Sequence, residues 1–279
     1  MQLFDAHCHL HDPRLDPWRA GALDDARALG VVGFACCAAE ESEWQAVLDL
    51  AASQPDVSPC LGLHPWFVAA ASPGWQRRLE ARLRAAPWVA LGEAGLDRAR
   101  RGRGMASLED QESALLVQAR LAVDLGRPLS LHGVRAWGRI LELLRPLGYH
   151  RAGWLLHSFA GPAELVEPLA RLGAYFSFSG IVTRHRATRT HAAARVVPAD
   201  RLLVETDAPD ITPILGEQAL QDPSLPRDDA GRVVNLPANL WVNLRALASV
   251  RGEPEVEVAQ HCHGNAVGLF SPMLSARPR

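Results

Sequence analysis

The sequence predicts an α/β protein that folds as a single-domain (β/α)8 TIM barrel. Eight short apolar runs recur along the 279 residues, and most of them lead into a residue with a reactive or metal-binding side chain. Successive end points lie about 29 residues apart, which suits one strand, one helix and their loops. In this fold strands alternate with helices, and the reactive side chains lie at the carboxyl ends of the strands.

Eight candidate strands alternate with helical segments. Residues 108–125 and 162–172 show helical periodicity, and the second segment follows Gly161 and stops at Gly173. An open doubly wound sheet would alternate in the same way, but only a closed barrel brings all strand ends around one mouth. The strands, each with the residue that follows it, are 3–6 (His7), 31–36 (Cys37), 57–63 (His64), 88–92 (Glu93), 128–131 (His132), 154–156 (His157), 174–178 (Ser179) and 202–206 (Asp207).

We expect residues 1–279 to form one domain, because α/β barrels reach this length as one unit. Residues 214–234 follow the last strand and are rich in Pro, Asp and Gly, which is typical of a long loop or lid over the active face.

Composition excludes several classes of protein. Residues 1–10 lack a basic segment and a long apolar stretch, so we expect no secretion signal and no membrane span. Five cysteines, two of them adjacent, do not resemble a disulfide framework and indicate a reducing cytoplasm. The sequence contains no lysine, which excludes a Schiff-base aldolase and a metal pair bridged by a modified lysine.

The first strand carries the motif D-A-H-C-H. Because alternate residues of a strand share a face, Asp5, His7 and His9 lie together. Buried imidazoles need partners for their ring nitrogens, and a divalent metal would satisfy two at once. The alternative is an edge strand with two solvated histidines, but we interpret the motif as half of a metal site.

The other strand ends supply the rest of that site. A two-metal hydrolase needs five or six nitrogen and oxygen ligands, with positions left for water and substrate. In the absence of lysine, Glu93 is the natural bridging ligand, and Asp207 could bind metal while accepting a proton from water. His11, His261 and His263 lie off the pattern. The expected ligands of two divalent ions are His7, His9, Glu93, His132, His157 and Asp207.

The ordered motifs resemble the TatD family of metal-dependent deoxyribonucleases, within the wider amidohydrolase-like barrels. They are D-A-H-C-H at 5–9, G-L-H-P at 62–65, G-E-A-G-L-D at 92–97, P-L-S-L-H at 128–132, H-S-F-A-G at 157–161, E-T-D-A-P at 205–209 and N-A-V-G-L-F at 265–270. The resemblance implies the same six ligands. It also implies that His64 contacts a phosphate beside the metals and that Glu205 and Thr206 support the last strand end.

Three departures from the family pattern lie on the substrate side. Asp97 is followed by Arg98 where an aromatic residue or His is common. The usual arginine two residues after His132 is replaced by Val134, with Arg135 one place later. The usual H-C-F-S-G reads H-S-F-A-G. None of these changes affects an expected ligand, so metal binding is better specified than the substrate.

Arginines after two strands indicate a phosphate-bearing substrate, since the guanidinium fork binds two oxygens. In a lysine-free chain some of them serve only as surface cations. The net charge of −2 argues against nucleic-acid binding by overall charge but allows a local basic patch. These arginines are Arg98, Arg100, Arg101 and Arg103 after the fourth strand and Arg184, Arg186 and Arg189 after the seventh.

We therefore expect a deoxyribonuclease, a hydrolase of ester bonds in which metal-activated water attacks phosphorus. Asp207 takes the proton, while the metals, bridged by Glu93, and His64 stabilise the developing negative charge. Trp66 either stacks on a base of single-stranded DNA or caps the barrel mouth.

Two alternatives remain, a metal-dependent deacylase or amidohydrolase and a non-catalytic metal-binding barrel. The ions could be Zn²⁺, Mg²⁺ or Mn²⁺. We expect a monomer that binds DNA transiently and has no membrane partner.

Overall fold

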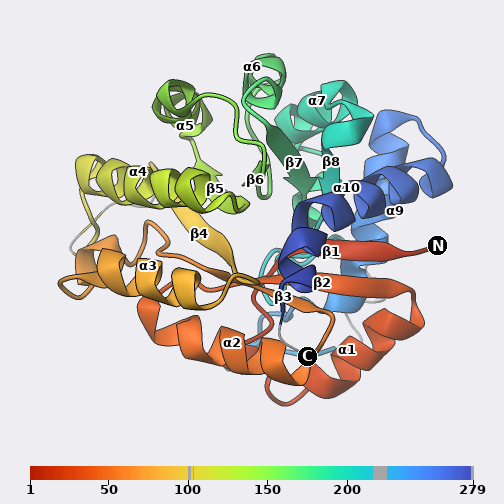
Figure 1. Ribbon diagram of the computed structural model, residues 1–279. Helices are drawn as coiled ribbons and strands as arrows, with labels where there is room; N and C mark the ends of the chain where they lie inside the picture. The colour runs from red at the N-terminus through yellow and green to blue at the C-terminus, as the bar shows by residue number, and fades with distance from the viewer. Residues whose placement is uncertain (100–101, 103, 216–224, 278–279) are drawn as a thin grey trace.

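Eight parallel strands form one sheet in the computed structural model, and their spatial order follows the chain from β1 to β8 (Figure 1). The structure describes residues 1–99, 102, 104–215 and 225–277. The strands are β1 (Leu3–Cys8), β2 (Val31–Cys37), β3 (Val57–Leu61), β4 (Ala90–Asp97), β5 (Leu129–Val134), β6 (Trp154–Leu156), β7 (Ala174–Phe178) and β8 (Leu202–Val204).

Backbone hydrogen bonds join the two ends of the sheet just beyond β8 and β1. The N–H of Asp207 donates to the carbonyl of His7 at 3.0 Å, and the N–H of His9 donates to the carbonyl of Ala208 at 2.7 Å. The sheet thus forms a nearly closed barrel with its mouth at the carboxyl ends of the strands. The predicted (β/α)8 fold is confirmed.

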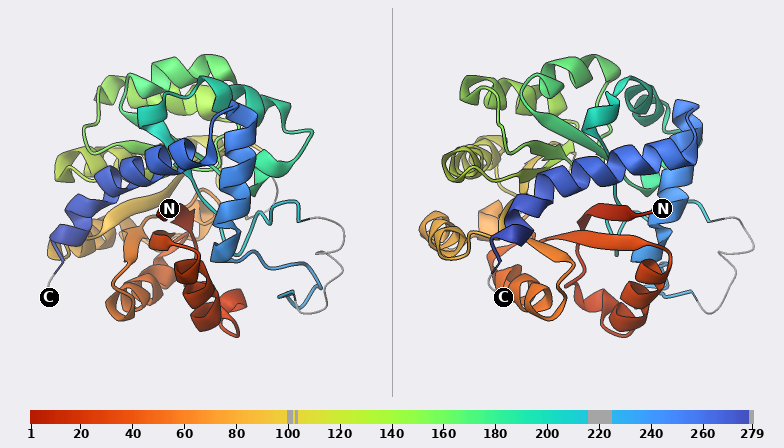
Figure 2. Two further views of the ribbon diagram at one scale, coloured as in Figure 1. Left: turned by 90° about the vertical axis from the view of Figure 1, so that its right-hand side faces the viewer. Right: turned by 45° about the vertical axis from the view of Figure 1, so that its right-hand side comes forward.

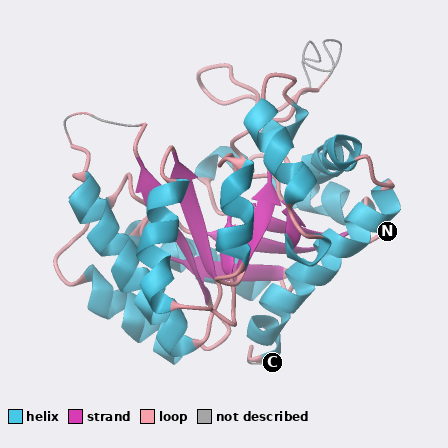
Figure 3. Ribbon diagram, turned by 90° about the horizontal axis from the view of Figure 1, so that it is seen from above, coloured by secondary structure: helices cyan, strands magenta, loops and turns pink. Residues whose placement is uncertain are grey.

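Helices surround the strands, which lie at the centre in Figure 3. The described helices are α1 (Arg19–Ala28), α2 (Trp44–Ser53), α3 (Trp75–Ala85), α4 (Leu108–Leu125), α5 (Trp137–Leu144), α6 (Val166–Ala170), α7 (Thr188–Val196), α9 (Leu240–Arg251) and α10 (Glu255–Ser275). The sequence predicted α4 to the residue. The hydroxyl of Ser107 caps its start by accepting from Asp110 N at 3.0 Å, and Gly126, with φ of 62°, ends it.

Several predicted boundaries differ from the observed ones. The segment 162–172 forms a 3-10 turn, Ala163–Leu165, followed by the short helix α6. β1 and β4 run past His7 and Glu93, so these residues lie within strands rather than after them. The reason is that a barrel strand alternates inward and outward side chains up to the mouth, so its last inward residues can face the site while still paired.

The opposite end of the barrel is closed by α10, which crosses it beside the N-terminus (Figure 2). The rings of Phe4 and Phe270 stack there, with centroids 5.3 Å apart and planes 2° from parallel. This end is filled by a buried apolar cluster that includes Ala6, Leu155 and Leu203. A substrate must therefore approach from the carboxyl ends of the strands.

The long segment predicted after the last strand is described only in part. Residues 216–224 of the predicted loop 214–234 lie outside the described residues, so its role as a lid stays a prediction. The end of the segment forms an antiparallel bridge between Arg227 and Val233. Within the described ranges, no helix is long and apolar enough to cross a membrane.

Candidate metal centre

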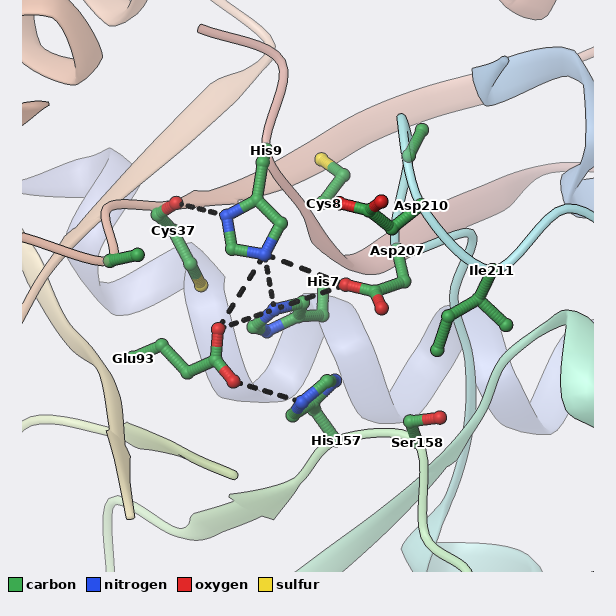
Figure 4. A network of polar contacts seen from close by, with 12 residues as sticks. His7, Cys8, His9, Cys37, Glu93, His157, Ser158, Asp207, Asp210 and Ile211 are labelled. Atoms are coloured by element: carbon green, nitrogen blue, oxygen red, sulfur yellow. Dashed lines mark hydrogen bonds and ion pairs between the residues drawn. The ribbon is translucent and has the colours of Figure 1, made fainter. Parts of the chain in front are cut away.

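The six predicted ligands meet at the barrel mouth, around the carboxylate of Glu93. Figure 4 shows five of them: His7, His9, Glu93, His157 and Asp207. Oε2 of Glu93 lies 3.4 Å from Nε2 of His7 and 3.5 Å from Nε2 of His9. Oε1 of the same carboxylate lies 2.9 Å from both Nδ1 of His132 and Nε2 of His157. Glu93 thus presents one oxygen to each of two pairs of imidazoles.

Asp207 lies beside the first pair of imidazoles. Its Oδ1 is 3.6 Å from Nε2 of His7 and 3.5 Å from Nε2 of His9. The backbone of Asp207 has a φ of 57°, in the left-handed region that residues other than glycine rarely adopt. Strain of this kind is concentrated at functional sites, where the surrounding structure holds it.

Oxygen partners orient two of the imidazoles. Nδ1 of His9 lies 2.7 Å from the carbonyl oxygen of Cys37, and Nδ1 of His157 lies 3.3 Å from Oε1 of Glu205. A carbonyl and a carboxylate only accept hydrogen bonds, so each Nδ1 carries the proton. In the neutral ring Nε2 then keeps its lone pair and faces Glu93, as a metal ligand requires.

A serine in β5, on the opposite side of the barrel from β1, orients His7. Oγ of Ser130 lies 2.8 Å from Nδ1 of His7. β4 packs so closely on this serine that a Cβ added to Gly92 would lie 2.7 Å from the Cβ of Ser130, and Gly92 has a φ of 135°. Asp5, which the motif places on the same face, instead accepts a hydrogen bond from Thr206 N at 2.9 Å. Its carboxylate supports the last strand end.

His64 also lies at the centre, but the proton of its ring is on Nε2, whereas His9 and His157 carry theirs on Nδ1. Its Nδ1 accepts a hydrogen bond from the backbone N–H of Trp66 at 3.2 Å, while its Nε2 lies 3.5 Å from Oε1 of Glu93. A neutral ring whose Nδ1 accepts must carry its proton on Nε2. His64 therefore offers a hydrogen-bond donor to the centre, although His64, Glu93 and His132 are also close enough to share an ion.

Charge coupling in the centre shifts several pKa values strongly, including those of Glu93 and His9. Burial acts to raise the pKa of Glu93, but the imidazoles of His157 and His64 hold it well below its usual range. Burial acts to lower the pKa of His9, but Asp207 and Glu93 raise it to about 9. The metal-free centre therefore combines charged carboxylates with a protonated imidazole.

The donor chemistry fits divalent cations. Oδ1 of Asp207 is buried, and none of the described residues donates a hydrogen bond to it. A buried carboxylate oxygen without a donor is costly, and a cation would satisfy it. Imidazole nitrogens and carboxylate oxygens suit Zn²⁺ and related ions, and a shared carboxylate suits a pair of them. The assignment of individual ligands stays a prediction.

A cleft of about 1160 Å³ opens over the centre. Of the predicted substrate contacts, Arg184 and Trp66 line this cleft, and the indole N–H of Trp66 donates to Oδ2 of Asp97 at 2.7 Å. Arg98 is exposed and does not belong to the cleft lining. Arg101 lies outside the described residues.

His11, which the sequence pattern did not place among the ligands, lines the cleft. Nε2 of His11 lies 3.1 Å from Oε2 of Glu43, and its Nδ1 lies 3.5 Å from Sγ of Cys36. The alternation that selected the two preceding histidines extends to this position and could have identified it. His261 and His263 lie in α10, away from the mouth.

Comparison with known proteins decides the family. The family model described as "TatD related DNase" matches residues 4–271. The chain belongs to the TatD family. This TatD-family chain is 31% identical over 276 residues to a protein of Cronobacter sakazakii named "3'-5' ssDNA/RNA exonuclease TatD", covering 96% of this chain and 97% of that relative.

A second relative carries a less specific name. It is the "Uncharacterized metal-dependent hydrolase YjjV" of Escherichia coli K12, 30% identical over 272 residues, covering 97% of this chain and 98% of the relative. The crystal structure of YjjV, described as a TatD homolog, superposes with a TM-score of 0.85 at 28% identity, covering 96% and 98% of the two chains. TatD-family membership thus sets the class of protein, while the named activities of its relatives differ.

Proposed function

We propose that this TatD-family protein is a metal-dependent nuclease that hydrolyses phosphodiester bonds of DNA. Three arginines without acidic partners line the cleft that contains the metal centre, and this observation carries the proposal. Within the described part of the chain, no hydrogen bond or ion pair holds the guanidinium groups of Arg135, Arg184 and Arg189. Unpaired guanidinium groups suit the phosphates of a nucleic-acid backbone.

The shared carboxylate supports hydrolysis rather than binding alone. Glu93 lies between two imidazole pairs and keeps its charge, because the surrounding histidines lower its pKa. When bound there, two divalent ions would supply a water of lowered pKa and positive charge near the phosphodiester. Glu93 fixes the spacing of the two ligand groups, and therefore the position of the scissile bond.

Two side chains act on the substrate and the attacking water in this proposal. Asp207 lines the cleft, and no described residue donates a hydrogen bond to its buried Oδ1, so it accepts the proton from the water. His64 carries its proton on Nε2 and donates it in a hydrogen bond to a non-bridging phosphate oxygen as charge develops.

The names of the relatives suggest the first substrate to test. Purification without chelator and elemental analysis identify the resident ions. The protein is then incubated with single-stranded DNA labelled at its 5' end, with added Mg²⁺, Mn²⁺ or Zn²⁺. We expect metal-dependent shortening, and the pattern of products distinguishes stepwise removal of nucleotides from internal cleavage.

The same experiment tests the deacylase alternative. Bis(p-nitrophenyl) phosphate, a p-nitrophenyl carboxylic ester and a lactone are assayed in parallel under the same metal conditions. Faster turnover of the carboxylic substrates, together with intact DNA, would replace the nuclease proposal by a deacylase. Metal binding without turnover of any of them would favour the non-catalytic barrel.

A further inference from the structure

Trp137 lies at the wall of the cleft, and its indole N–H has no hydrogen-bond partner among the described residues. Trp137 is the first residue of α5, which follows β5 (Figure 1), and it is 4% exposed. Its Nε1 is buried, and among residues 1–99, 102, 104–215 and 225–277 no acceptor lies within hydrogen-bond distance. A buried donor of this kind costs free energy unless a ligand supplies the acceptor.

Two glycines locate this nitrogen. A Cβ added to Gly133 would lie 2.5 Å from Cε2 of Trp137, and a Cβ added to Gly161 would lie 2.9 Å from Cδ1. Cε2 and Cδ1 are the two atoms bonded to Nε1, so both glycines pack against the part of the indole that carries the N–H. Both glycines line the cleft, one directly after His132 and the other four residues after His157. The indole of Trp137 therefore belongs to the wall of the same cleft that opens over the metal centre.

The surroundings of the indole are apolar. Val134, Pro162 and Leu165 line the adjoining part of the cleft and are half-buried. The ring of Phe159 packs against the indole with centroids 5.0 Å apart. An apolar wall with one neutral donor suits a flat, uncharged group that bears an acceptor atom, and it does not suit a charged phosphate.

We propose that Trp137 forms a nucleobase subsite, in which its indole N–H donates to a ring nitrogen or carbonyl oxygen of a base close to the scissile phosphate. Every base offers such an acceptor, so the contact positions a nucleotide without selecting a sequence. Arg135 lines the same cleft two residues earlier, which places a cation near the backbone phosphate of that nucleotide. The assignment rests on the proposed nuclease function.

The kinetic test uses single-stranded DNA in which one sugar, at successive positions, lacks its base. With wild-type protein, we expect one position where loss of the base lowers kcat/KM. Trp137→Phe should lower kcat/KM about fivefold on intact DNA, the effect of one neutral hydrogen bond, and should be insensitive to base loss at that position. Equal effects of Trp137→Phe on intact and base-free substrates would overturn the proposal.

Trp154 provides a matched control. Its Nε1 is also buried and has no partner in the described part of the chain, but Trp154 lies in β6 within the apolar core and not in the cleft lining. Trp154→Phe removes the same atoms, so we expect it to leave the ratio of activities on intact and base-free DNA unchanged. A change equal to that of Trp137→Phe would overturn the proposal.

A binding measurement separates the subsite from the nuclease activity. Wild-type protein labelled with ¹⁵N is titrated with methylphosphonate-linked dithymidine, and the indole resonance absent from Trp137→Phe is followed by NMR. We expect this resonance to shift, while the same probe without bases leaves it in place. A shift without any hydrolysis of DNA would uphold the subsite and reject the nuclease proposal, whereas hydrolysis with a stationary resonance would reject the subsite.

Discussion

Oγ of Ser130 lies 2.8 Å from Nδ1 of His7, a contact between β5 and β1 from opposite sides of the barrel. Ser130 is buried, and its Cβ packs closely on Gly92 of β4. The hydroxyl holds the ring of His7 so that Nε2 lies 3.4 Å from Glu93. Mutation of a residue that orients a metal-binding histidine commonly lowers metal affinity by about 10- to 100-fold.

Ser130→Ala should therefore weaken metal binding by about 10- to 100-fold, because it removes only the hydroxyl and keeps the Cβ contact. Isothermal titration of metal-free protein with Zn²⁺ or Mn²⁺ measures the change. Ser177→Ala is the matched control, since Ser177 is buried in β7 with a hydroxyl that has no partner among the described residues. Equal affinities for the Ser130 variant and wild type would show that the contact does not orient a ligand.

Metal affinity should rise with pH well above the ordinary range of histidine. In the metal-free protein His9 has a pKa raised to about 9, so at pH 7 its imidazole holds a proton that metal binding must displace. Because one proton leaves His9, we expect the metal affinity to increase about tenfold per pH unit up to about pH 9. Titrations with Mn²⁺ between pH 6.5 and 8.5 test this, and a plateau beginning near pH 6.5 would contradict it.

The same shift has a consequence for the stability of the metal-free protein. A folded-state pKa above the unfolded value means that protonated His9 stabilises the fold below about pH 6.5, and that this contribution is lost as pH rises through about 9. Thermal unfolding of chelated protein should therefore show a decline in Tm over this range. His9→Gln should reduce that decline.

Much of the fold and of the centre could be predicted from the sequence because both depend on local pattern. Apolar runs of strand length mark the barrel strands, and chemically active residues at their ends mark the mouth. Strand alternation then placed His7 and His9 together, and the topology brought Glu93 to them.

The remaining features depend on contacts between distant segments. The proton position of His64 follows from a backbone N–H two residues on, and the partner of His7 comes from another strand. The indole of Trp137 can be recognised as unpartnered among the described residues only when Gly133 of β5 and Gly161 pack against it. Apolar periodicity carries no information about such contacts, so sequence reasoning could not assign these roles.

Asp207→Asn should separate metal binding from turnover. The amide keeps one oxygen at nearly the same place, so metal content should stay close to wild type, while proton acceptance is lost and kcat falls on the order of a thousandfold. Elemental analysis and a nuclease assay measure the two quantities. Asp56→Asn is the control, because Asp56 pairs with Arg27 and does not belong to the cleft lining. Full activity of the Asp207 variant would remove this residue from the mechanism.

The salt dependence of catalysis should identify the arginines that contact phosphate. Arg184 is exposed at the cleft and lacks an acidic partner in the described part of the chain, whereas Arg98 lies outside the cleft lining. Each phosphate contact on a single strand contributes about 0.7 to the slope of log affinity against log salt. Arg184→Ala should therefore raise KM and reduce that slope by about 0.7, while Arg98→Ala should change neither. Equal slopes for both variants would mean that surface charge, rather than a contact at the cleft, governs binding of the strand.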